Sequence, residues 1–180
     1  VQIPESGFIV HHSSFIVPYL PSMPPSPSTF GMAVGGIGFQ INVPDNAWLA
    51  ALAPLYGEFP LDGEPEWQVT VSHDPDLEPA PQRWIKHDGS LTRFQTNQYA
   101  GWIDLARGQA LTCVSSAAAA PAALESAVAY ACMQMLPRTR DSLLLHAAGI
   151  FWQGRGLVIG GHAGAGKTTV ARLAQGYGEL

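Results

Sequence analysis

The chain has 180 residues, enough for one ordinary domain or for a small domain joined to part of another. With 47% hydrophobic and 13% charged residues it can bury a core, which excludes a disordered, charge-rich tail. A net charge of −5 and scattered Lys and Arg residues argue against nucleic acid as a partner, because phosphate binding needs clustered positive charge. No apolar run approaches the roughly 20 residues that span a bilayer, and no signal-peptide pattern precedes the first apolar patch. We therefore expect a cytoplasmic protein with no membrane partner.

Residues 1–30 are rich in Pro and Ser, a composition typical of an irregular arm. From residue 31 to residue 138 the pattern predicts an α+β domain. Its first element is one strand from Ala33 to Val43, although several glycines interrupt the apolar run. Asp45 is placed to cap a short helix that carries Trp48 and Leu52 and that ends or kinks at Pro54.

The next segments alternate between apolar and polar residues. Trp67, Val69 and Val71 fall on one face of a predicted half-buried strand. The stretch from Arg83 to Ser115 reads as a β-meander of three strands, with turns at residues 87–89 and 107–108.

A helix is predicted from Pro121 to about Leu136, because a proline in the first turn lacks only an N–H that would have no partner there. Apolar residues recur at helical spacing and give this helix a core face: Leu124, Val128, Ala131, Cys132 and Met135.

Residues 139–180 are expected to begin a second domain of α/β type. We predict an apolar strand that contains His146, a turn at residues 153–156, a strand at Leu157–Ile159 and a helix from Gly166 to Gln175. The second strand, the loop after it and the helix together form a strand–loop–helix unit.

The loop between the last strand and the last helix fits the pattern GxxxxGK[ST] at every position. Glycines permit backbone angles at which successive N–H groups converge on phosphate oxygens. We predict that the loop binds the phosphates of ATP or GTP through these residues: Gly161, His162, Ala163, Gly164, Ala165, Gly166, Lys167, Thr168 and Thr169.

Two side chains of the loop have predicted roles of their own. Lys167, at the helix start, is placed to reach the terminal phosphates, where its charge adds to that of the helix end. The hydroxyl of Thr168 is a hard oxygen ligand of the kind that Mg²⁺ prefers, so Thr168 is the candidate metal ligand. His162 occupies a variable position of the motif and is expected only to line the nucleotide site.

A P-loop does not choose a reaction, and kinases, GTPases, motor ATPases and transporters all use one. The flanking sequence narrows the choice. Segment 144–149 (LLHAAG), followed by a short turn and the loop from Gly160 to Thr169, resembles the catalytic core of the HPr kinase family and its bacterial relatives. In that family a His-containing strand leads through a tight hairpin into the P-loop, and here the resemblance covers residues 143–173.

The resemblance implies the start of an HPr-kinase-like, PEP-carboxykinase-like nucleotide-binding domain. It further implies an ATP-dependent and Mg²⁺-dependent kinase that phosphorylates a serine of a protein or peptide partner. By the same similarity His146 matches the active-site histidine, Lys167 the phosphate-binding lysine and Thr168 the metal-binding hydroxyl residue. Without the resemblance, a lone histidine in an apolar strand reads as a hydrogen-bonded core residue.

The remaining reactive side chains have structural interpretations. We expect Cys113 and Cys132 to be buried free thiols, and Arg138 and Arg140 to serve the end of the long helix. The other histidines are expected at the surface or in loops: His11, His12, His73 and His87.

Phosphoryl transfer needs a carboxylate base and acidic metal ligands, but Glu179 is the only acidic residue after the loop. We therefore expect the nucleotide-binding domain to be incomplete at Leu180, and the chain as given to be inactive. Two other readings stay open: a non-catalytic nucleotide-binding module that recruits a partner, and a small-molecule kinase on the same core. Self-association into a homo-oligomer also stays open.

Overall fold

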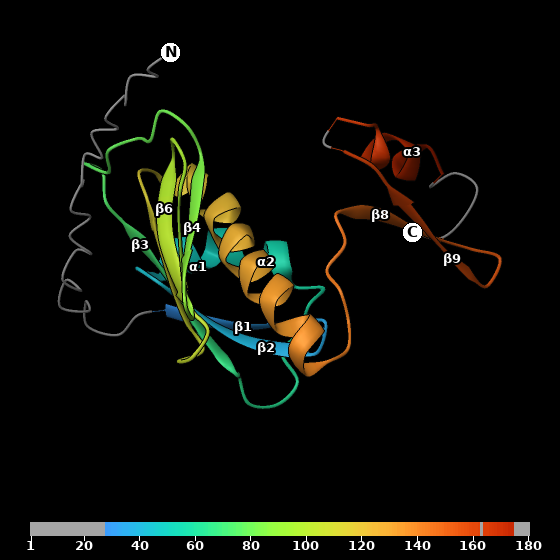
Figure 1. The fold of residues 1–180 in the computed structure, drawn as a ribbon, viewed down its shortest axis with the longest axis horizontal. Coiled ribbons are helices and arrows are strands. Elements are labelled where there is room, and N and C mark those ends of the chain that lie inside the picture. Colours follow the sequence, from blue (N-terminus) through green and yellow to red (C-terminus); the bar gives the residue numbers. More distant parts are fainter. Residues whose placement is uncertain (1–27, 163, 175–180) are drawn as a thin grey trace, which may run out of the picture.

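The computed structural model describes residues 28–162 and 164–174 and has the mixed composition of an α+β protein (Figure 1). Its strands are β1 (Ser28–Val34), β2 (Ile37–Val43), β3 (Trp67–His73), β4 (Trp84–Asp88), β5 (Leu91–Gln95), β6 (Tyr99–Asp104), β7 (Gln109–Val114), β8 (Ala147–Trp152) and β9 (Arg155–Gly160). Its helices are α1 (Asn46–Leu52), α2 (Ala120–Thr139) and α3 (Lys167–Ala174), with 3₁₀ turns η1 (Ala53–Tyr56) and η2 (Ala117–Ala119). Among the described residues, no helix has both the length and the apolar character needed to cross a bilayer.

The first seven strands form one sheet in the order β1-β2-β3-β7-β6-β5-β4. Strand β3 is parallel to both of its neighbours, β2 and β7, while the other pairs are antiparallel. Alternate residues of the central strands are buried, and they form one core with the inner faces of α1 and α2. Both helices lie on the same side of the sheet (Figure 1).

The segment expected as one strand from Ala33 to Val43 is two strands, so that prediction is wrong. β1 and β2 pair as a hairpin whose turn is Gly35 and Gly36, with φ of +59° and +78°. Both angles lie in the left-handed region, which glycine enters at little cost. β1 also begins at Ser28, so the last residues of the predicted arm belong to the sheet; residues 1–27 lie outside the described part of the chain.

Helix α1 begins as the sequence predicts. The carboxylate of Asp45 accepts hydrogen bonds from the backbone N–H groups of Ala47 (2.8 Å) and Trp48 (3.1 Å). Both N–H groups lie in the first turn, where no carbonyl of the helix can reach them. The α-helix ends at Leu52, before Pro54, and continues as the 3₁₀ turn η1.

The meander between Arg83 and Ser115 has four strands, β4 to β7, where three were predicted. The turn that was not predicted joins β5 to β6. There the hydroxyl of Thr96 accepts hydrogen bonds from the N–H groups of Gln98 and Tyr99, both at 3.1 Å. A threonine side chain thus closes a turn that contains neither Gly nor Pro, the residues by which turns are usually recognised.

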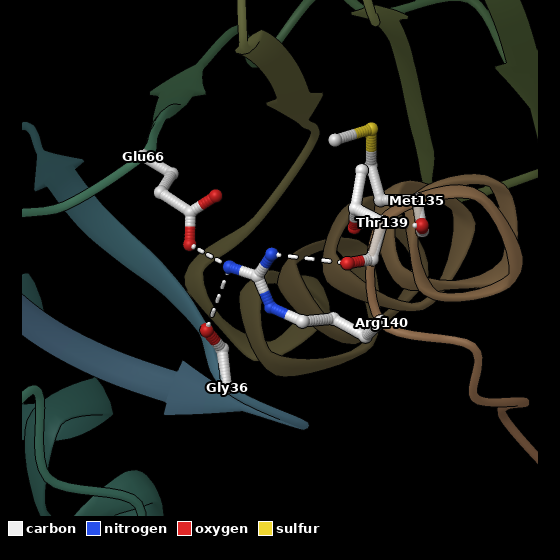
Figure 2. A network of polar contacts seen from close by, with 5 residues as sticks. All are labelled: Gly36, Glu66, Met135, Thr139 and Arg140. Carbon is white, nitrogen blue, oxygen red and sulfur yellow. Dashed lines mark hydrogen bonds and ion pairs between the residues drawn. The ribbon is translucent and has the colours of Figure 1, made fainter.

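Helix α2 has the predicted proline in its first turn and the predicted buried face, and it runs three residues past Leu136. Its end is fixed to the sheet by Arg140 (Figure 2). The guanidinium of Arg140 donates to the carboxylate of Glu66 (2.8 Å) and to the carbonyl of Gly36 (3.4 Å). The hydroxyl of Thr139 donates to the carbonyl of Met135 at 2.9 Å. Arg140 follows the last residue of the helix, as expected, and donates to the carbonyl of Thr139 at 3.3 Å, but its ion pair is with Glu66 rather than with the helix end.

Candidate P-loop site

The candidate site lies in the last three described elements, β8, β9 and α3, which Figure 1 shows set apart from the seven-stranded sheet. β8 and β9 form an antiparallel hairpin in which Trp152 pairs with Arg155. The two residues between them, Gln153 and Gly154, have φ of +49° and +75°. Positive φ at both positions is typical of the tight hairpin turn whose twist matches that of the strands.

The tight turn fixes the register of the whole hairpin. Counting back from the turn, Ala147 pairs with Gly160, which is the last residue of β9. Gly161 then leaves the sheet and enters the loop, so the chain before Ala147 has no strand residue opposite it.

His146 consequently lies just outside the hairpin, and the prediction that it belongs to the strand is wrong. The residue is exposed and precedes the first residue of β8. The turn also differs from the prediction, because Arg155 and Gly156 belong to β9 and only two residues turn the chain. An exposed imidazole next to the first hairpin pair is accessible to a ligand, and it is not a core residue.

The loop has the backbone geometry that its glycines permit. Gly164 and Gly166 have φ of +81° and +83°, and no atom outside their chain neighbours lies within 4 Å of where a Cβ would stand at either one. The N–H of Ala165 donates to the carbonyl of His162 at 3.1 Å, which closes a turn inside the loop. The N–H of Val170 donates to the carbonyl of Gly166 at 2.9 Å, so α3 begins directly after that glycine.

Lys167 is the buried charged residue of this loop, with a residual exposure of 9%. Its ammonium donates to the carbonyls of Gly161 (2.9 Å) and His162 (3.0 Å). The side chain therefore folds back over the loop. A Cβ on Gly161 would stand 3.1 Å from the Cβ of Ala165, a tight contact, and 3.9 Å from the Cγ of Lys167, an ordinary van der Waals distance, so a side chain there would crowd Ala165.

The two carbonyl partners of Lys167 are the part of the site that the motif did not identify. The motif names Gly161 and His162 as loop residues but assigns no role to their carbonyls. These bonds satisfy two of the three ammonium donors and hold the charge next to the first turn of α3. The N-terminal end of that helix carries partial positive charge, so the arrangement suits an anion.

Three of the remaining predicted site residues are exposed at the loop or the start of α3, and others lie outside the described residues. Thr168 and Thr169 are exposed in the first turn of α3, and His162 is exposed in the loop. Ala163 and Gln175 lie outside the described residues.

The fit to a nucleotide is therefore good for phosphate and sparse for magnesium. Phosphate would meet an ammonium, two threonine hydroxyls and the N–H groups of a glycine-rich turn. For Mg²⁺ the loop offers the hydroxyl of Thr168, and the sequence holds no Asp or Glu between Asp141 and Glu179. Within residues 28–162 and 164–174, no group of three or more His, Cys, Asp and Glu side chains is placed to hold a metal ion.

The hairpin and α3 expose much of their apolar surface. Ile150 is buried, whereas several large side chains of the same elements are exposed: Phe151, Trp152, Leu157, Val158, Val170 and Leu173. These side chains do not contribute to the core of the seven-stranded sheet.

The two cysteines lie in the seven-stranded sheet and α2, apart from the glycine-rich loop, and neither forms a disulfide. Cys132 is fully buried on α2, and burial raises the pKa of its thiol to about 11. Cys113 is half-buried, and burial is also the main cause that raises the pKa of its thiol. A thiol that resists ionisation is a poor nucleophile, so these are structural residues.

The other histidines within the described residues have structural contacts. The ring of His73 packs at a tilt against that of Trp48, with 5.6 Å between centroids and 47° between the ring planes. The Nδ1 atom of His87 lies 2.9 Å from the hydroxyl of Thr92. Both are exposed, as expected, and His11 and His12 lie outside the described residues.

Comparison with known proteins adds no family to this picture. No protein-family model matches the chain, and searches of curated proteins and of solved structures find no match.

Proposed function

We propose that this chain carries the ATP-binding segment of an HPr-kinase-like serine kinase, which phosphorylates a protein or peptide partner in the cytoplasm. The observation that carries the proposal is the conformation of the loop around Lys167. Its ammonium is held by two loop carbonyls beside the first turn of α3, and the glycines before it take left-handed backbone angles. That combination suits an anion such as a chain of phosphates.

Under this proposal the residues of the loop divide the work of binding. Lys167 contacts the terminal phosphates, and the loop N–H groups bind the phosphate oxygens. Thr168 supplies a hydroxyl ligand to Mg²⁺, which when bound would neutralise charge on the phosphates. His146 is exposed just before the hairpin, so its imidazole is accessible as a hydrogen-bonding group to a ligand of the loop.

Phosphate transfer from labelled ATP tests the proposal. The intact protein that contains this segment is incubated with Mg²⁺ and candidate serine peptides, alongside its Lys167→Ala and His146→Ala variants and the matched control Arg155→Ala. Arg155 is an exposed cation at the turn end of the same hairpin, whereas the loop follows the other end of β9. We expect transfer to be lost in Lys167→Ala, reduced in His146→Ala and unchanged in Arg155→Ala.

Two outcomes bear directly on the assignments. Transfer that survives Lys167→Ala would overturn the P-loop mechanism. An unchanged rate in His146→Ala would remove the histidine from the site while leaving the nucleotide-binding role of the loop in place.

One observation favours a second candidate, a nucleotide-binding module that recruits a partner without catalysis. The elements around the loop contain no carboxylate, because the sequence has none between Asp141 and Glu179. A kinase needs such a group to accept the proton of the substrate hydroxyl. Tight ATP binding without transfer to any serine peptide or small alcohol would favour this module over both kinase readings.

A further inference from the structure

Strand β4 is an edge of the seven-stranded sheet, since it pairs with β5 on one side and with no other described strand. An edge strand presents unpaired backbone groups to which another chain can add. One face of this edge carries two cations and the other borders a partly apolar groove, so an added strand could contact both.

On the face of the sheet away from α1 and α2, two cations stand directly opposite each other. Lys86 of β4 pairs in register with Arg93 of β5. Neither side chain has an ion-pair partner among the described residues, and like charges in opposite positions destabilise a sheet. A pair of this kind is relieved when an anion binds to it.

Two tryptophans border the cation pair on the same face. The ammonium of Lys86 lies 5.4 Å from the ring centroid of Trp84, and Trp102 stands opposite Arg93 on β6. The indole N–H of Trp102 is buried and has no hydrogen-bond partner in the described structure. Trp and Arg are the residue types that dominate the binding energy of protein interfaces.

On the other face, beside α2, a groove of about 370 Å³ opens next to the same edge. It lies between β4 and α2 and is lined by Ile85, His87, Tyr130, Met133 and Gln134. Ile85 and Met133 are 38% and 54% exposed, which leaves apolar surface uncovered where an added strand would point its side chains.

We propose that β4 accepts an extended peptide of a partner protein, in which acidic and apolar residues alternate. Successive side chains of a strand point to opposite faces, so such a peptide places its carboxylates at Lys86 and Arg93 and its apolar side chains in the groove. The net charge of −5 opposes a long polyanion such as nucleic acid, whereas a short acidic segment needs only the two local cations. This surface does not depend on the nucleotide site, so it goes beyond the proposed function.

The test measures binding of a fluorescein-labelled decapeptide of alternating Glu and Leu by fluorescence anisotropy. We expect Lys86→Gln with Arg93→Gln to weaken binding about tenfold. The matched control, Arg138→Gln with Arg155→Gln, removes the same charge from exposed positions elsewhere and should bind as the wild type does. Met133→Gln should also weaken binding, because it removes an apolar side chain that lines the groove.

A second readout separates recognition from a structural role. Removal of the opposed cations should raise the melting temperature while it lowers affinity, because the like-charge repulsion disappears with the binding charge. A peptide of alternating Gln and Leu should bind more weakly than the acidic one.

Three results would overturn the proposal. The first is equal binding by the double variant and the wild type. The second is tighter binding of a single-stranded oligonucleotide than of the acidic peptide. The third is that no peptide binds and that the double variant differs from the wild type in self-association measured by sedimentation. That result would assign the edge to a second copy of the chain.

Discussion

Tyr56 shows how burial of a single side chain couples stability to pH. Its ring stacks on that of Phe30 with 6.1 Å between centroids, and its hydroxyl donates to the carbonyl of Pro121 at 3.4 Å. Burial, and to a smaller extent the charge of Glu125, raise its pKa from 10.0 to about 12.

The raised pKa predicts a loss of stability at alkaline pH. Above pH 10 the unfolded chain releases the phenol proton while the folded chain retains it, so the free energy of unfolding should fall as pH rises towards 12. Tyr56→Phe should reduce this slope. Part of the slope should remain in that variant, because the buried thiol of Cys132 also has a raised pKa, of about 11. Urea unfolding at a series of pH values measures the effect, and equal slopes in both proteins would contradict it.

At the same scale, the motif located the charged residue of the candidate site but not its contacts. Lys167 follows from the spacing of the glycines, whereas its bonds to the carbonyls of Gly161 and His162 depend on the backbone path of the loop. The position of His146 depended on register. With a two-residue turn, His146 would pair with Gly161, but the chain leaves the sheet at Gly161. Neither the turn length nor this exit can be predicted from an apolar run.

At the scale of elements, the packing of β6 against its neighbours depends on the absence of a side chain at Gly101. A Cβ there would stand 2.5 Å from the carbonyl oxygen of Leu111 and 2.6 Å from the ring of Phe94. Neither neighbour can move freely, because the carbonyl belongs to the backbone of β7 and Phe94 is buried in the core.

We therefore expect Gly101→Ala to lower the free energy of unfolding by about 1–3 kcal/mol, the usual cost of overpacking. Gly57→Ala is the matched control. Gly57 has φ of −62°, and its nearest neighbour to an added Cβ is 3.7 Å away. Urea denaturation followed by circular dichroism compares the two, and similar losses in both variants would refute the packing argument.

The elements that the sequence predicted well are those whose signal is periodic. Helix α2 and strand β3 show their buried faces in the spacing of apolar residues. Two boundaries were missed because the turns depend on local contacts that interrupt the periodic pattern at single residues. The pair Gly35 and Gly36 turns the chain inside an apolar run, and the hydroxyl of Thr96 closes a turn that carries no Gly or Pro.

At the scale of the whole molecule, the core of the described residues lies in the part of the chain that precedes the hairpin. Its buried residues extend from Met32 to Leu136, and none belongs to the hairpin or to α3. The ion pair between Arg140 and Glu66, on exposed side chains, is the last sheet contact described before the hairpin, and such pairs contribute little to stability.

The sheet and its two helices should therefore fold without β8, β9 and α3. A shortened chain of residues 1–142 should unfold cooperatively in urea at the same midpoint as the sheet of the full chain, as measured by circular dichroism. An unfolded or noncooperative product would show that the hairpin and α3 contribute to the core after all.

The α+β class followed from the order of periodic segments, and the structure confirms it as a mixed sheet with helices. The open edge at β4 did not follow, because strand order is decided by contacts between distant residues. β3 and β7 are adjacent in the sheet although β4, β5 and β6 lie between them in the chain.

The central claim is that the loop around Lys167 binds nucleotide phosphates, and titration of a fluorescent ATP analogue with Mg²⁺ tests it most directly. Binding by the wild type and by Arg155→Ala should be equal. Lys167→Ala should lose at least about tenfold in affinity, because it removes a charge-assisted hydrogen bond to phosphate. Equal affinity in Lys167→Ala and in the wild type, with both proteins folded, would contradict the account.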